Sequence, residues 1–271
     1  MPEFTTAGLG AWTEPHPFAV TAERLAQYAE ATNDPIKAHR EGEVAAPVFA
    51  IAPVFQTLGP AVFGVVPLEL VPRLVHGEHD FHFHRPIRPG DSLVSRSRPV
   101  GVVSREKGTT VVVRSETRDG DGELVNEQWM TAYFRGVDGG LTAGEPAPPH
   151  AFDDDGDPLE TVTARIDEDQ TFRYGPAAGD PMPIHLDADF ARQVGLPGII
   201  VHGMCTLAFA SWAVLTRFAA DDVTRLARLA VRFAKPVLPG AEITTAVHAG
   251  GAFQTTAGGA LVLKDGLAVL R

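Results

Sequence analysis

Residues 83–90, FHRPIRPG, and residues 233–240, FAKPVLPG, share the pattern FxxPxxPG and begin 150 positions apart (233 − 83). A second repeated pattern lies upstream of these stretches, and its two copies are 146 positions apart (174 − 28). It pairs a tyrosine, an aspartate and a histidine of one copy with those of the other: Tyr28 with Tyr174, Asp34 with Asp180, and His39 with His185. Ordered self-similarity of this kind indicates an internal repeat. We therefore expect two copies of one domain.

The segment between the copies has the composition of a linker. Residues 138–158 contain DGG, GEPAPPH and DDDGD, without apolar periodicity. The DDDGD run does not match an EF-hand calcium loop, because the twelfth position counted from Asp153 is Ala164 rather than a glutamate. We expect an N-terminal domain over residues 1–140, a linker over 141–160 and a C-terminal domain over 161–271.

Each copy shows the same order of predicted elements. A helical stretch at 21–33, with Thr21 as its N-cap, precedes apolar segments of helical length at 48–63 and 203–218. Strands follow, of which 229–233 alternates apolar and polar residues, and KDG at 264–266 predicts a hairpin turn. A long apolar helix followed by an antiparallel meander predicts an α+β fold. No GxGxxG motif follows a predicted strand, and no GxxxxGK[ST] motif occurs. The sequence therefore gives no support for a nucleotide-binding fold.

Composition excludes several classes of protein. The 271 residues are 44% hydrophobic and carry a net charge of −11, which argues against a disordered chain and against a basic nucleic-acid-binding surface. The single cysteine, Cys205, cannot form an internal disulfide or a cysteine-based zinc site. Neither a signal-like start nor an apolar run of about 18 residues is present in the sequence. We expect a cytoplasmic protein without a membrane partner.

Residues 174–206, YGPAAGDPMPIHLDADFARQVGLPGIIVHGMCT, contain the candidate chemistry. Gly179 permits a positive φ, and Asn33 at the matching position tolerates one. The prolines that follow Asp180 favour extended backbone, so we expect a stiff, non-helical loop that holds Asp180 and His185. A carboxylate and an imidazole on a rigid loop suit proton transfer.

His202 and Gly203 open the second apolar helix. The N–H groups at a helix start have no partner within the helix, so the Gly203 N–H can stabilise a carbonyl oxygen that gains negative charge. The alternative is that Gly203 only allows close helix packing, and that His202 is a structural hydrogen-bonding residue. Tyr174 either packs under the loop or lines the pocket.

The pattern GDxxPxH, followed by HLD and then by LPGIIVHGM before a long helix, resembles the MaoC-like hydratases, which include the (R)-specific enoyl-CoA hydratases. The resemblance implies a double hotdog fold and a lyase of fatty acid metabolism. Its reaction would be the reversible hydration of a trans-2-enoyl thioester, on CoA or a carrier protein, to the (R)-3-hydroxyacyl thioester, without a metal or other cofactor. It further implies that Asp180 and His185 are the acid–base pair and that Gly203 donates to the thioester oxygen. The family has an asparagine where this chain has Met182.

Further substrate contacts are expected near these residues. Arg232 and Lys235 flank the end of the 229–233 strand, where they either bind phosphates of a CoA-like ligand or form a solvated face. The complete set of expected substrate-binding residues is Tyr174, Met182, His202, Arg232 and Lys235.

The repeat predicts one active site per chain. At an offset of 150, His202 and Gly203 correspond to Ala52 and Pro53, and proline has no backbone N–H to donate. Pro53 and Pro60 should also bend or break the first apolar helix. We therefore expect catalysis in the second copy, and a first copy that shapes the cavity for the acyl chain.

Other interpretations stay open. The histidines of 76–84 suggest a metal site, but a polar strand face is the preferred interpretation because the second copy lacks ligands at the matching positions. A hotdog thioesterase and a non-catalytic acyl-thioester-binding subunit are the alternative functions. A homodimer is possible in each case.

Overall fold

The computed structural model describes residues 4–152 and 156–271, and these residues form two compact units. The first comprises the chain up to Phe18, Pro53–His82 and Ser92–Pro149, and the second comprises Ala19–Ala52, Phe83–Asp91 and His150–Arg271. The second unit therefore includes two segments of the N-terminal half of the chain, whereas the first unit includes none of the C-terminal half. The domain boundaries at 140 and 161 stay a prediction. The run Asp153–Asp155 of the expected linker lies outside the described residues.

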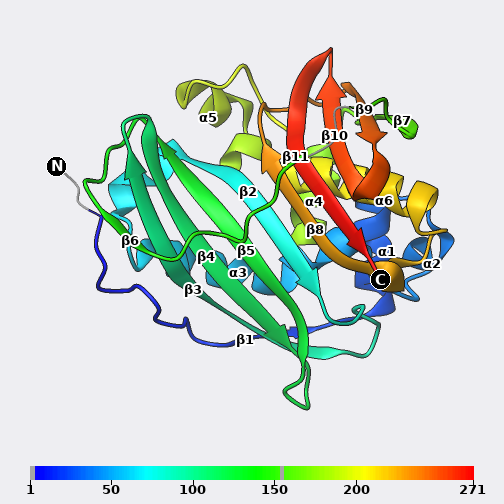
Figure 1. Ribbon diagram of the computed structural model, residues 1–271, viewed down its shortest axis with the longest axis horizontal. Coiled ribbons are helices and arrows are strands. Elements are labelled where there is room, and N and C mark those ends of the chain that lie inside the picture. The colour runs from blue at the N-terminus through cyan, green and yellow to red at the C-terminus, as the bar shows by residue number, and fades with distance from the viewer. Residues whose placement is uncertain (1–3, 153–155) are drawn as a thin grey trace. The chain divides into compact units, whose positions relative to one another are not determined.

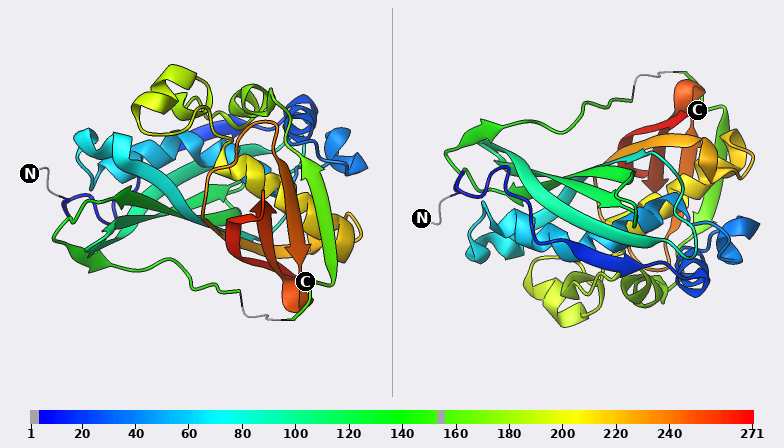
Figure 2. Two further views of the ribbon diagram at one scale, coloured as in Figure 1. Left: turned by 90° about the horizontal axis from the view of Figure 1, so that it is seen from above. Right: turned by 90° about the horizontal axis from the view of Figure 1, so that it is seen from below.

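The first unit contains a sheet with one long helix on its face (Figures 1 and 2). Its strands follow the order β1-β3-β4-β5-β2, and β6 pairs with β3. The helix is α3 (Ile51–Phe63), which is followed by the 3₁₀ segment η2 (Leu68–Arg73). The strand bounds are β1 His16–Ala19, β2 Leu74–Phe83, β3 Ser92–Arg105, β4 Gly108–Arg118, β5 Leu124–Arg135 and β6 Thr142–Gly144.

Alternating side chains bind this sheet to α3. Ser97 of β3 pairs in register with Ser115 of β4, and their hydroxyls lie 2.6 Å apart. The Thr57 hydroxyl of α3 lies 2.6 Å from the same Ser97 hydroxyl. Since successive strand residues face opposite sides, the residues that flank Ser97 point away from the helix.

The second unit contains the sheet β8-β11-β10-β9-β7, whose neighbouring strands are antiparallel. Its long helix is α6 (Gly203–Phe218), in which every residue from Met204 to Leu215 is buried. The strand bounds are β7 Glu160–Arg165, β8 Leu226–Phe233, β9 Glu242–Val247, β10 Ala252–Ala257 and β11 Ala260–Leu270. The shorter helical elements are α1 Ala22–Ala31, α2 Lys37–Arg40, η1 Pro47–Ala50, α4 Gln170–Ala178, η3 Pro183–His185, α5 Ala188–Gln193, η4 Val223–Arg225 and η5 Ala249–Gly251.

Several expectations are confirmed. A long helix with an antiparallel sheet in each unit is the predicted α+β architecture, and α6 has the predicted bounds 203–218. The Thr21 side chain caps α1 by accepting from the Arg24 N–H at 3.2 Å. Strand β8 contains the alternating segment 229–233.

Two expectations are wrong. KDG at 264–266 is not a hairpin turn, because β11 runs through it with a register shift, and Asp265 has a φ of 53°. The turn between β10 and β11 is instead at Gly258 and Gly259, which both have positive φ. The first apolar helix is not broken at Pro60, because α3 continues through it. The helix changes from η1 to α3 at Ile51, two residues before Pro53.

No helix in the described parts of the chain is long and apolar enough to cross a bilayer.

Candidate active site

The end of α4 places Asp180. Gly179 caps the helix in the left-handed conformation with a φ of 75°, and Asn33 at the matching repeat position has a φ of 47°, which confirms both predictions. The Asp180 N–H donates to the Gly175 carbonyl at 2.9 Å. A Cβ on Gly175 would lie 3.1 Å from the Asp180 carbonyl oxygen, so glycine keeps this turn tight.

The Asp180 carboxyl is held by the backbone that follows it. Its Oδ1 accepts from the Met182 N–H at 3.0 Å, and its side chain is 18% exposed. Burial raises the pKa of Asp180 to about 6, and the Met182 amide partly offsets this. The resemblance implies an asparagine at position 182, but a bond from the backbone amide needs no particular side chain. The Met182 side chain itself is exposed.

His185 lies in η3, so the expectation of a wholly non-helical loop is wrong: residues 183–185 form one 3₁₀ turn. Its Nδ1 lies 2.8 Å from the Ile200 carbonyl oxygen. Because a carbonyl only accepts, Nδ1 carries the proton and Nε2 keeps a lone pair in the neutral ring. Burial lowers the pKa of His185 to about 4, with the Ile200 bond opposing it, so the ring is neutral at pH 7.

His202, the residue before α6, contacts both members of the pair. Its ring stacks on the His185 ring, with centroids 3.8 Å apart and planes inclined by 26°. Its Nε2 lies 4.0 Å from Asp180 Oδ2. Burial and the neighbouring His185 lower the pKa of His202 to about 2. A hydrogen-bonding interaction with the Asp180 backbone partly offsets this lowering.

These three side chains converge. One donor atom of each of Asp180, His185 and His202 lies within 4.8 Å of those of the other two. The Asp180 carboxyl and the His185 imidazole are therefore close enough for one water to hydrogen-bond to both. At pH 7 both Asp180 and His185 are in the form that accepts a proton.

Gly203 is the first residue of α6 and follows His202 directly. Its N–H has no acceptor within the helix, because the first N–H groups of a helix point away from it. A Cβ on Gly203 would lie 3.1 Å from two atoms of the Phe233 ring. Close packing thus accounts for the glycine independently of any catalytic role. The constraint from Phe233 had no signal in the sequence.

Tyr174 packs beneath the site. It is 1% exposed, its hydroxyl lies 3.2 Å from the Tyr28 hydroxyl, and its ring centroid is 4.9 Å from that of His202. Burial raises the pKa values of both tyrosines well above the usual value. Of the two expected roles, the contacts therefore favour packing under the loop. In the sequence, Tyr28 was identified only as the residue that corresponds to Tyr174 in the first copy of the repeat.

The two basic candidates differ. Arg232 pairs with Asp265 through Nη1 and Oδ2 at 3.2 Å, whereas the Lys235 side chain is exposed. The carboxylate that pairs with Arg232 comes from the bulge of β11, where a hairpin turn was expected. The structure therefore joins Asp180, His185, His202 and Gly203, but it does not bring Arg232 or Lys235 into contact with them in any described interaction.

The matching residues of the first copy form a closed pair. Asp34 Oδ2 lies 2.7 Å from His39 Nδ1, and both side chains are at most 1% exposed. The second carboxylate oxygen of Asp34 accepts from the Ile36 N–H at 2.9 Å. Both oxygens of the Asp34 carboxylate therefore have hydrogen-bond partners within the protein.

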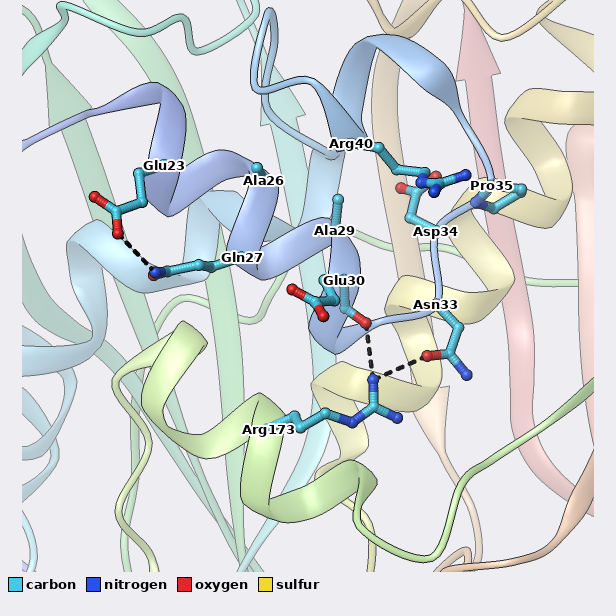
Figure 3. A pocket seen from close by; sticks show the side chains of 10 residues that line it. All are labelled: Glu23, Ala26, Gln27, Ala29, Glu30, Asn33, Asp34, Pro35, Arg40 and Arg173. Carbon is cyan, nitrogen blue, oxygen red and sulfur yellow. Dashed lines mark hydrogen bonds between the residues drawn. The ribbon is translucent and has the colours of Figure 1, made fainter.

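A surface pocket of about 540 Å³ lies beside this closed pair, over α1 (Figure 3). Acidic and basic residues line it together, including Glu23, Glu30, Arg40 and Arg173. Arg173 donates to the Glu30 carbonyl at 3.0 Å and to Asn33 Oδ1 at 3.1 Å, so it serves to join α4 to α1. None of the expected catalytic residues lines this pocket.

The histidines of β2 contact neighbouring side chains, and the polar strand face preferred for this segment stays a prediction. His79 bonds to His76 at 3.1 Å through Nδ1 and to Gln128 at 3.1 Å through Nε2, and His82 lies 3.2 Å from Asp80. Within residues 4–152 and 156–271, the one group of three or more histidine, cysteine or acidic residues with metal-like spacing is Asp180, His185 and His202.

Known proteins resemble both halves of the chain. The family described as MaoC like domain matches residues 153–262, and the family described as FAS1-like, dehydratase domain region matches residues 7–128. The 3-hydroxyacyl-thioester dehydratase Y of Mycobacterium tuberculosis is 30% identical over 210 residues, which cover 75% of this chain and 68% of that protein. The peroxisomal enoyl-CoA hydratase 2 of Arabidopsis thaliana is 29% identical over 64% of this chain, and the match spans only 59% of that protein.

Solved structures share the fold. A MaoC-like dehydratase from Phytophthora capsici superposes with a TM-score of 0.87 at 23% identity, over 98% of both chains. A Mycobacterium tuberculosis protein described as having a double hotdog fold superposes with a TM-score of 0.63 at 14% identity, over 99% of this chain and 96% of that one. The expected double hotdog fold is confirmed.

Proposed function

Because this chain belongs to the MaoC-like dehydratase family, we propose that it catalyses the reversible hydration of a trans-2-enoyl thioester to the (R)-3-hydroxyacyl thioester. The observation that carries the proposal is the convergence of Asp180 and His185 within 4.8 Å, next to the first residue of α6. The thioester is carried by CoA or by a carrier protein, and the exposed Lys235 is a candidate contact for its phosphate groups.

The thioester carbonyl accepts a hydrogen bond from the Gly203 N–H. This bond stabilises the negative charge that the oxygen gains when a nucleophile attacks C3. Close packing of Phe233 against Gly203 keeps a side chain away from that position. The amide therefore acts as an oxyanion donor at the start of a buried helix.

A water molecule between Asp180 Oδ2 and His185 Nε2 supplies both parts of the addition. The pair accepts one proton as the water oxygen bonds to C3, and the π electrons of the C2–C3 double bond move into an enolate. The pair then returns a proton to C2, so both residues end as they began. Both groups start in their basic forms at pH 7, so the C2 proton must come from the water through the pair.

The test is turnover of crotonyl-CoA and of a longer enoyl-CoA. The loss of the enoyl absorbance measures the rate, and the chirality of the product is then determined. Asp180→Asn and His185→Gln should each lower kcat by about 10²–10⁴-fold. The matched controls are Asp189→Asn and His16→Gln, which lie outside the site and should not change kcat.

Either of two other results would identify a different function. Release of free thiol from acyl-CoA would identify a thioesterase, and binding of enoyl-CoA without turnover would identify a non-catalytic subunit. Wild-type activity in Asp180→Asn or His185→Gln would remove the residue assignment.

A cytoplasmic location and a homodimeric state are part of this proposal. The Arabidopsis relative is named as peroxisomal, so cell fractionation is the direct test of the location. Sedimentation of the purified chain tests the dimer.

A further inference from the structure

We propose that His202 is a positioning residue that keeps the Asp180–His185 pair open, so that the carboxyl and the imidazole do not bond directly to each other. That this open pair serves hydration rests on the proposed function. The way in which the pair is held open does not depend on it.

The two copies of the repeat hold their aspartates in the same way. Asp34 Oδ1 accepts from the Ile36 N–H at 2.9 Å. Asp180 Oδ1 accepts from the Met182 N–H at 3.0 Å. A histidine follows the aspartate by five positions in each copy (39 − 34 and 185 − 180). The backbone turn therefore occupies one carboxylate oxygen alike in both copies and leaves Oδ2 for another partner.

The two histidines nevertheless bond differently. His39 Nδ1 lies 2.7 Å from Asp34 Oδ2, which closes the first pair. His185 Nδ1 lies 2.8 Å from the Ile200 carbonyl oxygen instead. Within the described residues, no hydrogen bond joins the His185 ring to the Asp180 carboxyl. The same spacing of acid and imidazole thus gives a closed pair in one copy and an open pair in the other.

The start of each long helix shows which residues correspond in space. Ile87 and Val237 have the same position in the repeated FxxPxxPG pattern. The Ile87 carbonyl accepts from the Ala45 N–H at 2.9 Å, and the Val237 carbonyl accepts from a matching N–H at 2.8 Å. That second donor is Val201. Ala45 is therefore the structural counterpart of Val201.

The next residue, His202, then corresponds to Ala46. Each stands directly before a helix, with a φ of −55° for His202 and of −59° for Ala46. The match of His202 with Ala52 at an offset of 150 is therefore wrong, because the loop before the helix is longer in the second copy. Pro47 takes the place of Gly203, so the first copy still lacks an N–H there. Beside the pair, one copy has an imidazole where the other has a methyl group.

The His202 ring contacts both members of the pair. It stacks on the His185 ring with 3.8 Å between the centroids, and its Nε2 lies 4.0 Å from Asp180 Oδ2. A hydrogen bond with the Asp180 backbone and the Tyr174 ring, 4.9 Å away, hold it in place. A turn of His185 about its Cβ–Cγ bond would drive a ring edge into His202. Since the His202 side chain is only 1% exposed, it acts through His185 rather than by touching substrate.

The experiment compares two substitutions of His202 in the whole chain. His202→Ala leaves the methyl group that the first copy has, whereas His202→Phe keeps a flat ring. NMR titration of protein with labelled histidines measures the His185 pKa, and the His185 signal is assigned by its absence in His185→Gln. In the wild type, we expect a pKa of about 4.

His202→Ala should raise the His185 pKa by at least about one pH unit, because a bonded carboxylate favours the charged ring. Entry of water would also raise it, so the titration is repeated with Asp180→Asn added. The rise should disappear in this double variant. His202→Phe should keep the wild-type pKa. The matched controls are His248→Ala and His248→Phe, since His248 is also buried and contacts a ring, that of Phe152. Neither should change the His185 pKa.

Turnover gives a second measurement. His202→Ala should lower kcat for crotonyl-CoA by about 10²-fold and leave KM little changed, because it misplaces His185 without removing a substrate contact. His202→Phe should retain most of the kcat, and the two His248 variants should retain all of it. A general loss of folding would not produce this split or the recovery by phenylalanine.

The outcomes separate this inference from the proposed function. A His185 pKa that stays near 4 in His202→Ala, or that rises equally with Asp180→Asn present, would overturn the inference. His202→Ser replaces an alanine variant that does not fold by circular dichroism. If neither folds, the wild type decides, because a His185 pKa at or above the usual 6.5 would mean that the pair is already closed. A protein that shows the Asp180-dependent rise but hydrates no enoyl-CoA would refute only the proposed function.

Discussion

The imidazole ring of His202 lies on that of His185, with 3.8 Å between the ring centroids and 26° between the planes. Since the Ile200 carbonyl already holds one edge of the His185 ring, the stacked His202 restricts the remaining motion of its plane. His202 is in turn the residue from which α6 begins. The orientation of the proposed catalytic imidazole is therefore coupled to the start of the long buried helix α6.

Asp180→Asn should stabilise the protein at pH 8. Burial raises the pKa of Asp180 from 3.8 to about 6. A group whose pKa is raised by folding favours the folded state at low pH, and this contribution is lost as the pH rises through the folded pKa. The neutral amide avoids that loss, so the free energy of unfolding should rise by about 3 kcal/mol at pH 8 and little at pH 4. Urea unfolding at both pH values measures it. An equal effect at the two pH values would contradict burial of the charged carboxylate as the cause.

The pH profile of kcat/KM should have one acid limb at about pH 6, because Asp180 must be ionised and His185 is neutral above about pH 4. Met182→Pro should move this limb upward by about one pH unit, because it removes the N–H that stabilises the carboxylate. The Met182 φ of −58° already suits proline.

Met182→Asn is the matched control for this shift. It keeps the N–H and introduces the amide side chain that the family has, so the acid limb should stay at its original pH. A limb that moves in Met182→Asn but not in Met182→Pro would show that the side chain at this position, rather than the backbone, sets the pKa of Asp180.

Gly203→Ala should destabilise the chain by about 1–3 kcal/mol, because the added Cβ would lie 3.1 Å from the Phe233 ring. Adding Phe233→Leu should recover part of this loss relative to Phe233→Leu alone, since leucine lacks the crowding ring atoms. Thermal unfolding of the four proteins forms a double-mutant cycle. A Gly203→Ala protein with unchanged stability but no activity would instead point to crowding of the bound thioester.

Asp34→Asn should lower the free energy of unfolding by about 1–3 kcal/mol, because it weakens the buried hydrogen bond with His39. The kcat of the protein that remains folded should not change, because Asp34 lies outside the proposed catalytic group. Activity measured well below the melting temperature checks this. A loss of kcat at full folding would show that the first copy takes part in catalysis.

The local pattern of the sequence was sufficient to predict the repeat and several helices and strands. The offset between Tyr28 and Tyr174 marked two residues whose hydroxyls lie 3.2 Å apart, and the Asp180–His185 spacing marked the site. Thr21 and the bounds of α6 were readable because caps and apolar runs act within one element. At 264–266, the KDG pattern predicted a turn that does not form. The pairing of β11 with β8 continues on both sides of it, with a bulge between.

By itself, the sequence determined that two related copies exist, that the second carries an acid and an imidazole on a proline-bounded turn, and where the helix behind them begins. Only the tertiary structure decided that Ile200 sets the tautomer of His185, that His202 stacks on His185, and that Asp34 and His39 bond to each other in the interior. The physical reason is that hydrogen-bond direction, ring stacking and burial depend on how neighbouring segments pack. Residue type and spacing along the chain do not specify that packing.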